Sequence, residues 1–248
     1  MTDNTKAIEK LFEVKAHLGH KTNRVHPKAK KYIYTVENGV SIIDLTQTEE
    51  LLRKAKEYMG KLAGENKVVL VVVTKKIASQ QIQVLCQQYS LHFVSTKWPA
   101  GLLTNFETIK KNIKKLNQLK KERSEDAWQK FVKHDRVKLE KELAKLEKAY
   151  GGLAQMTKLP EAVLIVDIKK EKNAVIEALK NNIPMVAITD TNVDPDKIDF
   201  PIPANDDSLS SVEYIVKELL EAYGNVKGKS EIKKTEGDLP ADKAVKVN

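Results

Sequence analysis

The chain has 248 residues, of which 41% are hydrophobic and 31% charged, and its formal net charge is +9. This composition predicts a globular protein with one sizeable core, and no apolar run reaches the roughly 20 residues that a membrane-spanning helix needs. A single cysteine, Cys86, excludes an intramolecular disulfide and a multi-cysteine zinc site, and we expect it to be a small buried residue. The first residues carry charges throughout and no apolar signal core, so we expect a cytoplasmic protein.

Residues 15–34 form the first unusual segment, with five Lys, one Arg, three His and no Asp or Glu. Such a density of positive charge is typical of a surface that binds the backbone of a polyanion, although a solvated basic surface is the simpler alternative. His17 and His20 are spaced so that they could share a helix face, with His26 nearby, but zinc would need a further ligand. Hydrogen bonding to phosphate or stacking on a base suits these imidazoles better.

Residues 30–44 predict a β-hairpin, because apolar residues alternate on both sides of Asn38-Gly39, a pair that favours tight turns. Thr46 then predicts a helix N-cap, with Glu49 as its partner in a capping box. The helix should run to about Leu62 and stop at Gly64.

Buried strands are predicted at 67–74, 162–167 and 184–189, where Val, Leu, Ile and Ala run without alternation. Shorter strands are expected at 91–95 and 200–202, and helices at 77–89, 171–182 and 208–223. This alternation indicates an α/β fold with a doubly wound parallel sheet.

Residues 105–149 interrupt that rhythm with 14 Lys or Arg and seven Asp or Glu between Lys110 and Lys148. Apolar residues recur there at steps of three and four, which predicts a protruding helical, coiled-coil hairpin with its break near 124–125. We therefore expect a discontinuous sheet domain, 1–104 and 150–223, with an inserted hairpin at 105–149. Residues 224–248 carry few large apolar groups and should be disordered.

Several aspartates follow the predicted strands and should gather at the carboxyl edge of the sheet, where such folds place ligands. They could hold magnesium, which prefers carboxylate oxygen, or even support phosphoryl transfer. Turn formation and helix capping explain the same residues more simply, and the chain lacks a Gly-rich phosphate loop and a nucleophile elbow. We expect no metal site and no catalysis; the candidates, if a metal bound, are Asp190, Asp194 and Asp206, with Asp167 and Asp207 nearby.

Residues 97–115 lead into the hairpin, with Trp98 and Phe106 on either side of a Pro-Ala-Gly turn. The start of the helix near Thr104-Asn105 should offer free backbone amides, which bind phosphate well. The two rings could stack on bases, but anchoring the hairpin to the sheet is the favoured interpretation.

Three long segments in order resemble the bacterial small-subunit ribosomal protein two family: AHLGHKTNRVHPKAKKYIY with NGVSIIDLTQT, KWPAGLLTNFETI, and GGLAQMTKLPEAVLIVD with NNIPMVAITDTNVDPDKIDFPIPANDDS. The resemblance spans about residues 5–223. It implies a flavodoxin-like sheet with a protruding hairpin and a structural, non-enzymatic protein of the small ribosomal subunit. It also implies contacts with small-subunit rRNA and with other small-subunit proteins, including the large protein built of repeated oligonucleotide-binding modules. No membrane and no small-molecule substrate are expected.

The resemblance also places the RNA-binding segment on particular residues, although Lys97 stands where the family usually has Arg, and Val25 where a Trp is common. The missing Arg weakens bidentate phosphate recognition at that position. Two alternatives stay open: a magnesium-dependent phosphoester enzyme that uses the strand-end aspartates, and a coiled-coil adaptor for another protein. The predicted RNA-binding residues are His17, His20, Lys21, Arg24, Lys28, Lys30, Lys31, Tyr32, Lys97, Thr104, Asn105, Lys110, Lys111, Lys114 and Lys115.

Overall fold

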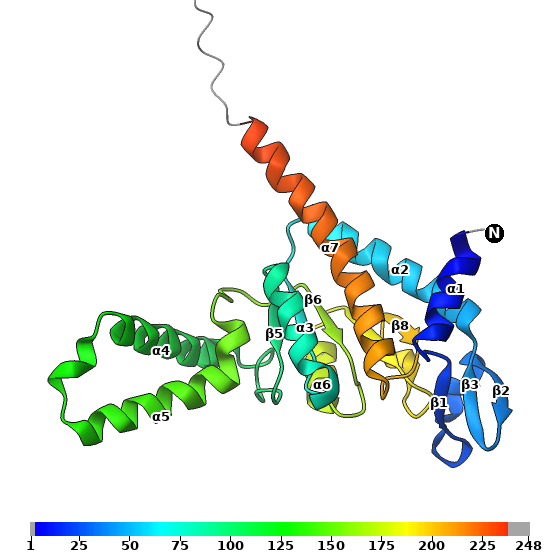
Figure 1. Ribbon diagram of the computed structural model, residues 1–248, viewed down its shortest axis with the longest axis horizontal. Helices are drawn as coiled ribbons and strands as arrows, with labels where there is room; N and C mark the ends of the chain where they lie inside the picture. Colours follow the sequence, from blue (N-terminus) through cyan, green and yellow to red (C-terminus); the bar gives the residue numbers. More distant parts are fainter. Residues whose placement is uncertain (1–2, 238–248) are drawn as a thin grey trace, which may run out of the picture.

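A five-stranded parallel sheet forms the centre of the computed structural model, which describes the backbone of residues 3–237 and the side chains of residues 5–226 (Figure 1). Its spatial order is β5-β4-β6-β7-β8. Numbered by their order along the chain, these strands read 2-1-3-4-5, the flavodoxin-like arrangement of a doubly wound sheet. The predicted fold class is confirmed. The strands are β4 (Val69–Val72), β5 (His92–Val94), β6 (Ala162–Ile165), β7 (Met185–Thr189) and β8 (Phe200–Pro203).

Helices cover both faces of this sheet, because alternate residues of each strand enter different clusters. Val69 and Val71 face α2 (Leu45–Gly64), α3 (Lys76–Gln88) and α7 (Leu209–Gly237). Leu70 and Val72 face α6 (Lys172–Lys180), the loop that begins at Trp98, and the start of α4 (Phe106–Ser124). Burial on both faces explains why the strands β4, β6 and β7 are apolar at every position.

The N-terminal part adds a helix and a small antiparallel sheet beside the β8 edge (Figure 1). After α1 (Asp3–Glu13), three strands pair in the order β1-β3-β2. They are β1 (Leu18–Lys21), β2 (Ile33–Glu37) and β3 (Val40–Ile43). The predicted hairpin is confirmed, with φ of 49° at Asn38 and 77° at Gly39 in its turn. The helix α1 and the strand β1 were not predicted.

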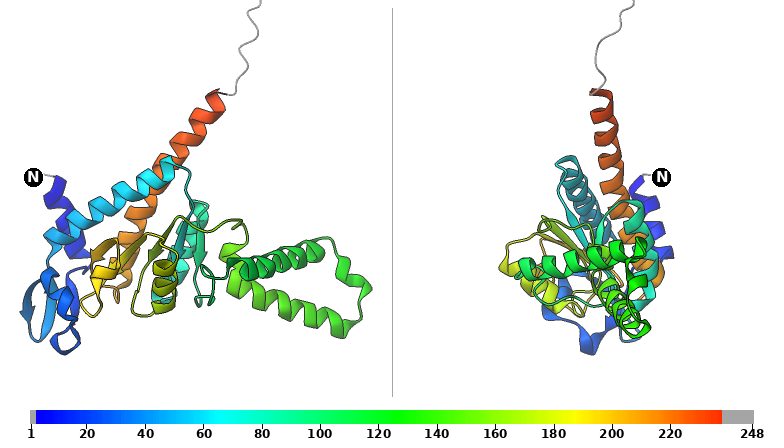
Figure 2. Two further views of the ribbon diagram at one scale, coloured as in Figure 1. Left: turned by 180° about the vertical axis from the view of Figure 1, so that it is seen from behind. Right: turned by 90° about the vertical axis from the view of Figure 1, so that its left-hand side faces the viewer.

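The inserted hairpin projects from the opposite, β5 edge of the sheet (Figure 2). It consists of α4 (Phe106–Ser124) and α5 (Lys133–Tyr150), joined through a short 3-10 helix, Ala127–Lys130. Leu116, Leu119, Trp128 and Leu143 form its own buried cluster. The break predicted near 124–125 is confirmed.

Two local predictions are wrong. Asp44, not Thr46, caps α2, because its Oδ1 accepts a hydrogen bond from the Thr46 amide at 2.9 Å. Residues 224–237 are helical rather than disordered, since α7 continues to Gly237. The continuation packs on the domain, with Gly224 directly against the Tyr89 ring and Val226 against the core. The rest of the predicted tail, 238–248, lies outside the described residues.

None of the helices in the described part of the chain is both long and apolar enough to cross a bilayer.

Candidate nucleic-acid interface

Thr191, directly after β7, fixes the N-terminal basic segment against the carboxyl edge of the sheet. Its carbonyl accepts a hydrogen bond from the His26 amide at 2.8 Å, and its Oγ1 accepts one from the His20 amide at 2.9 Å. Gly19 lies so close that a Cβ there would be 2.7 Å from Thr191 Cγ2. Strand β1 therefore needs glycine at this position to approach the sheet domain.

Two of the predicted RNA-binding lysines form ion pairs within the protein. They lie on a 3-10 helix, Pro27–Tyr32, which faces a second one, Pro195–Lys197. Lys28 Nζ is 3.2 Å from an Asp194 oxygen and 3.3 Å from an Asp196 oxygen, and Lys31 Nζ is 2.7 Å from Asp196. These pairs position the segment and leave less of the two lysines' charge for an external ligand.

The other four cations of the segment, Lys15 among them, remain available. Lys21, Arg24 and Lys30 are exposed, and their side chains have no ion-pair or hydrogen-bond partner among the described residues. We call these three residues the N-terminal cation face. Beside them, Tyr32 is half-buried, with Lys31 Nζ 5.1 Å from the centre of its ring.

The histidines do not share a helix face as predicted, because His20 lies on strand β1 and His17 directly precedes it. His17 stacks on Phe12 with ring centres 4.3 Å apart, and burial lowers the pKa of His17. His20 Nδ1 is 3.0 Å from an oxygen of buried Asp190, and this contact raises the pKa of His20. Both imidazoles therefore have partners inside the protein.

Lys75, directly after β4, lies among the strand-end aspartates and was not recognised from the sequence. Its Nζ is 2.8 Å from Asp206, 2.7 Å from Asp207 and 3.5 Å from Asp167. Burial raises the pKa of Asp206 to about 6, while hydrogen bonds to Asp206 and Asp207 outweigh burial and raise the pKa of Lys75. Among the residues that the structure describes, no group of three or more His, Cys, Asp or Glu is arranged to hold a metal ion.

Buried Glu177 on α6 holds the loop that leads into the hairpin. One carboxylate oxygen accepts hydrogen bonds at 2.9 Å from both Trp98 Nε1 and the Gly101 amide. The other accepts from the amides of Leu103 at 3.0 Å and Thr104 at 3.3 Å, and from the Thr104 hydroxyl at 3.4 Å. The prediction of a free amide at Thr104 is therefore wrong, because Glu177 already occupies the position proposed for a phosphate.

Trp98 is only 5% exposed, and Phe106 packs against the same cluster of sheet residues. Their anchoring role is confirmed. Asn105, at the start of α4, accepts a hydrogen bond from the Thr108 hydroxyl at 2.9 Å.

The hairpin presents a second group of cations. Lys111 and Lys114 are exposed and Lys110 is half-buried, and the described residues supply none of the three with a side-chain partner. We call these three the hairpin cations. Lys97 is exposed and likewise unpaired within the described part of the chain, whereas Lys115 forms an ion pair with Glu142. The two groups lie on opposite sides of the sheet domain, because the N-terminal segment packs near β8 and the hairpin leaves from β5 (Figure 2).

Comparison with known families agrees with the motifs and with this architecture. The family model for ribosomal protein S2 matches residues 11–225, which include the N-terminal segment, the sheet domain and the hairpin. The match covers most of the chain and ends at Asn225, beside Val226 in the part of α7 that packs on the core. The chain therefore belongs to the ribosomal protein S2 family.

Proposed function

We propose that this structural protein of the small ribosomal subunit binds small-subunit rRNA through the N-terminal cation face and the hairpin cations. The observation that carries the proposal is that the basic segment contains both paired and unpaired cations. Lys28 and Lys31 are engaged by Asp194 and Asp196, whereas the three residues of the N-terminal cation face are exposed and unpaired within the described chain.

The chemistry of these side chains suits an RNA backbone. Lys21 and Lys30 are mobile point charges, and the planar guanidinium of Arg24 can donate two parallel hydrogen bonds to one phosphate. Phosphate contacts of this kind release counterions and give affinity with little reading of base sequence. Thr191 and the ion pairs of Lys28 and Lys31 hold the segment in place, so little backbone ordering remains to be done on binding.

We expect no catalysis from the strand-end carboxylates. Lys75 and His20 already contact Asp167, Asp190, Asp206 and Asp207, so these carboxylates have partners within the protein. The protein would instead have a structural role on the ribosome, where it would also support docking of neighbouring ribosomal proteins. The large protein of repeated oligonucleotide-binding modules is the expected neighbour.

The test is binding to small-subunit rRNA over a range of salt concentrations. Replacing Lys21, Arg24 and Lys30 together with alanine should reduce the slope of log affinity against log salt by about 2–3, since each phosphate contact contributes roughly 0.7–0.9. The same variant should be lost from small subunits at a lower salt concentration during sedimentation.

A matched control removes the same charge elsewhere. Lys61 on α2 and Lys172 and Lys180 on α6 are exposed and have no side-chain partner within the described chain, so their triple alanine variant loses the same net charge from unpaired side chains. It should retain nearly the full slope. Equal slopes for the two triple variants would show that net charge alone, and not the N-terminal cation face, governs binding.

A further inference from the structure

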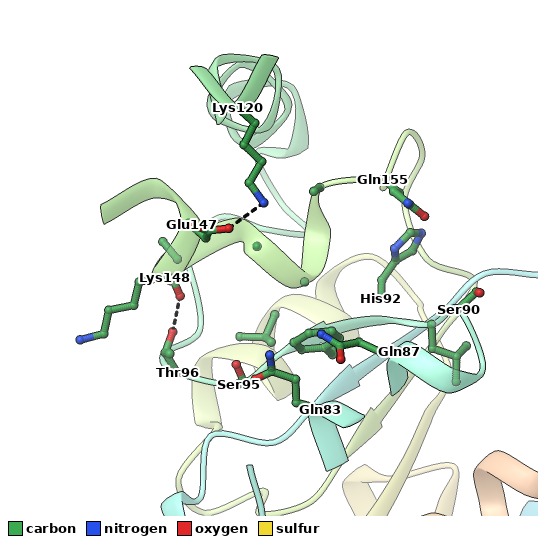
Figure 3. A pocket seen from close by; sticks show the side chains of 17 residues that line it. Gln83, Gln87, Ser90, His92, Ser95, Thr96, Lys120, Glu147, Lys148 and Gln155 are labelled. Carbon is green, nitrogen blue, oxygen red and sulfur yellow. Dashed lines mark hydrogen bonds and ion pairs between the residues drawn. The ribbon is translucent and has the colours of Figure 1, made fainter. Parts of the chain in front are cut away.

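A cavity of about 590 Å³ lies between the β5 edge of the sheet and the base of the hairpin (Figure 3). One side is formed by the end of α3 and by β5, and the other by α4, α5 and the short 3-10 helix Gly151–Leu153. Its volume falls in the range of roughly 300–1,000 Å³ that small-molecule sites occupy. It is distinct from the N-terminal cation face, which lies toward the opposite edge of the sheet.

The lining of this cavity is polar but mostly uncharged. Gln83 and Gln87 come from α3, Ser90 from the turn after it, and Gln155 from the segment after the hairpin. Their side chains have no hydrogen-bond partner within the described chain. Each Gln amide offers two donor hydrogens and an acceptor oxygen, so the cavity presents three complete sets of unused donors and acceptors.

Charge is confined to the rim. Lys120 Nζ is 2.8 Å from a Glu147 oxygen, so these two charges compensate one another. The backbone carbonyl of Lys148 accepts a hydrogen bond from the Thr96 hydroxyl at 2.9 Å, while its side chain extends away from the cavity into solvent (Figure 3). The fixed charges of the lining therefore either pair with one another or point away from the cavity, and the imidazole of His92 lies beside Gln155 (Figure 3).

A peptide strand is a poor occupant, even though β5 is an edge strand. Gly152 covers the middle of this three-residue strand, because a Cβ at Gly152 would overlap the Phe93 carbonyl oxygen and ring. An added strand needs continuous access to backbone groups along the edge. The contact with Gly152 removes that access at Phe93.

We propose that this cavity binds a single unstacked nucleotide of an RNA strand, with its base among Gln83, Gln87 and Gln155 and its phosphate directed toward the open rim. A nucleobase is flat, neutral and rich in donors and acceptors, and glutamine pairs well with base edges. The inference rests on the proposed RNA-binding function and adds a base-recognising site to it.

The experiment follows the side-chain amide signals of Gln83, Gln87 and Gln155 by nuclear magnetic resonance in the full-length chain. The probes are the four nucleoside 5′-monophosphates, with ribose 5-phosphate as the probe that lacks a base. The nucleotides should shift these signals in a saturable way at millimolar concentration, and ribose 5-phosphate should leave them in place. Gln87→Leu should weaken nucleotide binding about two- to tenfold, which is the expected loss of one hydrogen bond.

Gln88→Leu is the matched control, because Gln88 is exposed on the same helix and does not line the cavity. It should bind nucleotides as the unchanged protein does, and unchanged backbone signals in both variants would show that each folds normally. Absence of nucleotide-induced shifts, or equal shifts with ribose 5-phosphate, would overturn the inference. The proposed function fails separately, because its failure appears as an unchanged salt slope in the variant of the N-terminal cation face.

Discussion

Removing the charge of Glu177 should destabilise the loop that connects the sheet to the hairpin. Its carboxylate accepts five hydrogen bonds from a loop that offers mainly donors, including the Trp98 indole and three backbone amides. Glu177→Gln keeps the shape of the side chain but replaces one acceptor oxygen with an NH₂ group. That group would face N–H donors whichever way the amide is turned.

The size of the effect follows from which bonds are lost. One oxygen accepts two bonds and the other accepts three, so at least two bonds disappear in either amide orientation. At about 1.5 kcal/mol for each bond to a charged group, the free energy of unfolding should fall by about 3 kcal/mol. Urea denaturation followed by circular dichroism and by tryptophan fluorescence measures this directly.

The pH dependence gives an independent check on Glu177. Burial opposes its ionisation, but the hydrogen bonds from Trp98 and the loop amides prevail and lower its pKa. A carboxyl group with a lowered pKa in the folded state stabilises the protein above the pKa of the unfolded state and loses that contribution as pH falls through the folded value. The difference between the unchanged protein and Glu177→Gln should therefore shrink toward acid pH.

Glu140→Gln is the control, since Glu140 is exposed on α5 and has no side-chain partner in the described region. It should change the free energy of unfolding by no more than about 0.5 kcal/mol. A Glu177→Gln variant as stable as this control would refute the conclusion that the carboxylate holds the loop.

Three further outcomes concern single positions. The pKa of Asp206 is raised to about 6, so between pH of about 4 and 6 the folded state retains a proton that the unfolded state has lost. The free energy of unfolding should therefore fall as pH rises through this range. In urea titrations, Asp206→Asn should make that fall smaller. Gly19→Ala should lower the free energy of unfolding by about 1–3 kcal/mol because its methyl group would be 2.7 Å from Thr191 Cγ2, and adding Thr191→Ser should recover part of the loss. Cys86 is fully buried and its pKa is raised to about 12, so a thiol reagent should modify it quickly only after denaturation.

The sheet and the hairpin could be predicted because their signals are local. An apolar run such as 67–74 indicates a strand buried on both faces wherever it pairs, and β4 lies within it. Asn38-Gly39 specifies a tight turn through its own backbone preferences. The seam of the hairpin follows from the periodicity of residues such as Ile113 and Leu116.

The partners of charged residues could not be predicted, because they depend on distant parts of the chain. Glu177 lies 79 residues from Trp98 in sequence, and Lys75 lies 131 residues from Asp206. Nothing in the pattern around Lys28 distinguishes it from Lys30, yet only Lys28 lies opposite Asp194. The segment alone therefore identifies a basic surface but not which of its cations are free.

The separation of the two groups of cations bears on what the protein can bind at once. Opposite edges of a five-stranded sheet are about 19 Å apart, since four strand spacings of roughly 4.8 Å lie between them. This is about twice the Debye length at 0.1 M salt, so the N-terminal cation face and the hairpin cations should act almost independently. Such a protein would bridge two segments of folded rRNA rather than follow one groove.

Independence has a measurable consequence for rRNA affinity. Replacing Lys21, Arg24 and Lys30 with alanine, and separately Lys111 and Lys114, should give losses in log affinity that sum in the combined variant. The salt slopes should fall in the same additive way, because each group releases its own counterions. A combined variant no weaker than either parent would mean that both groups serve one cooperative contact, and the bridging geometry would then be wrong.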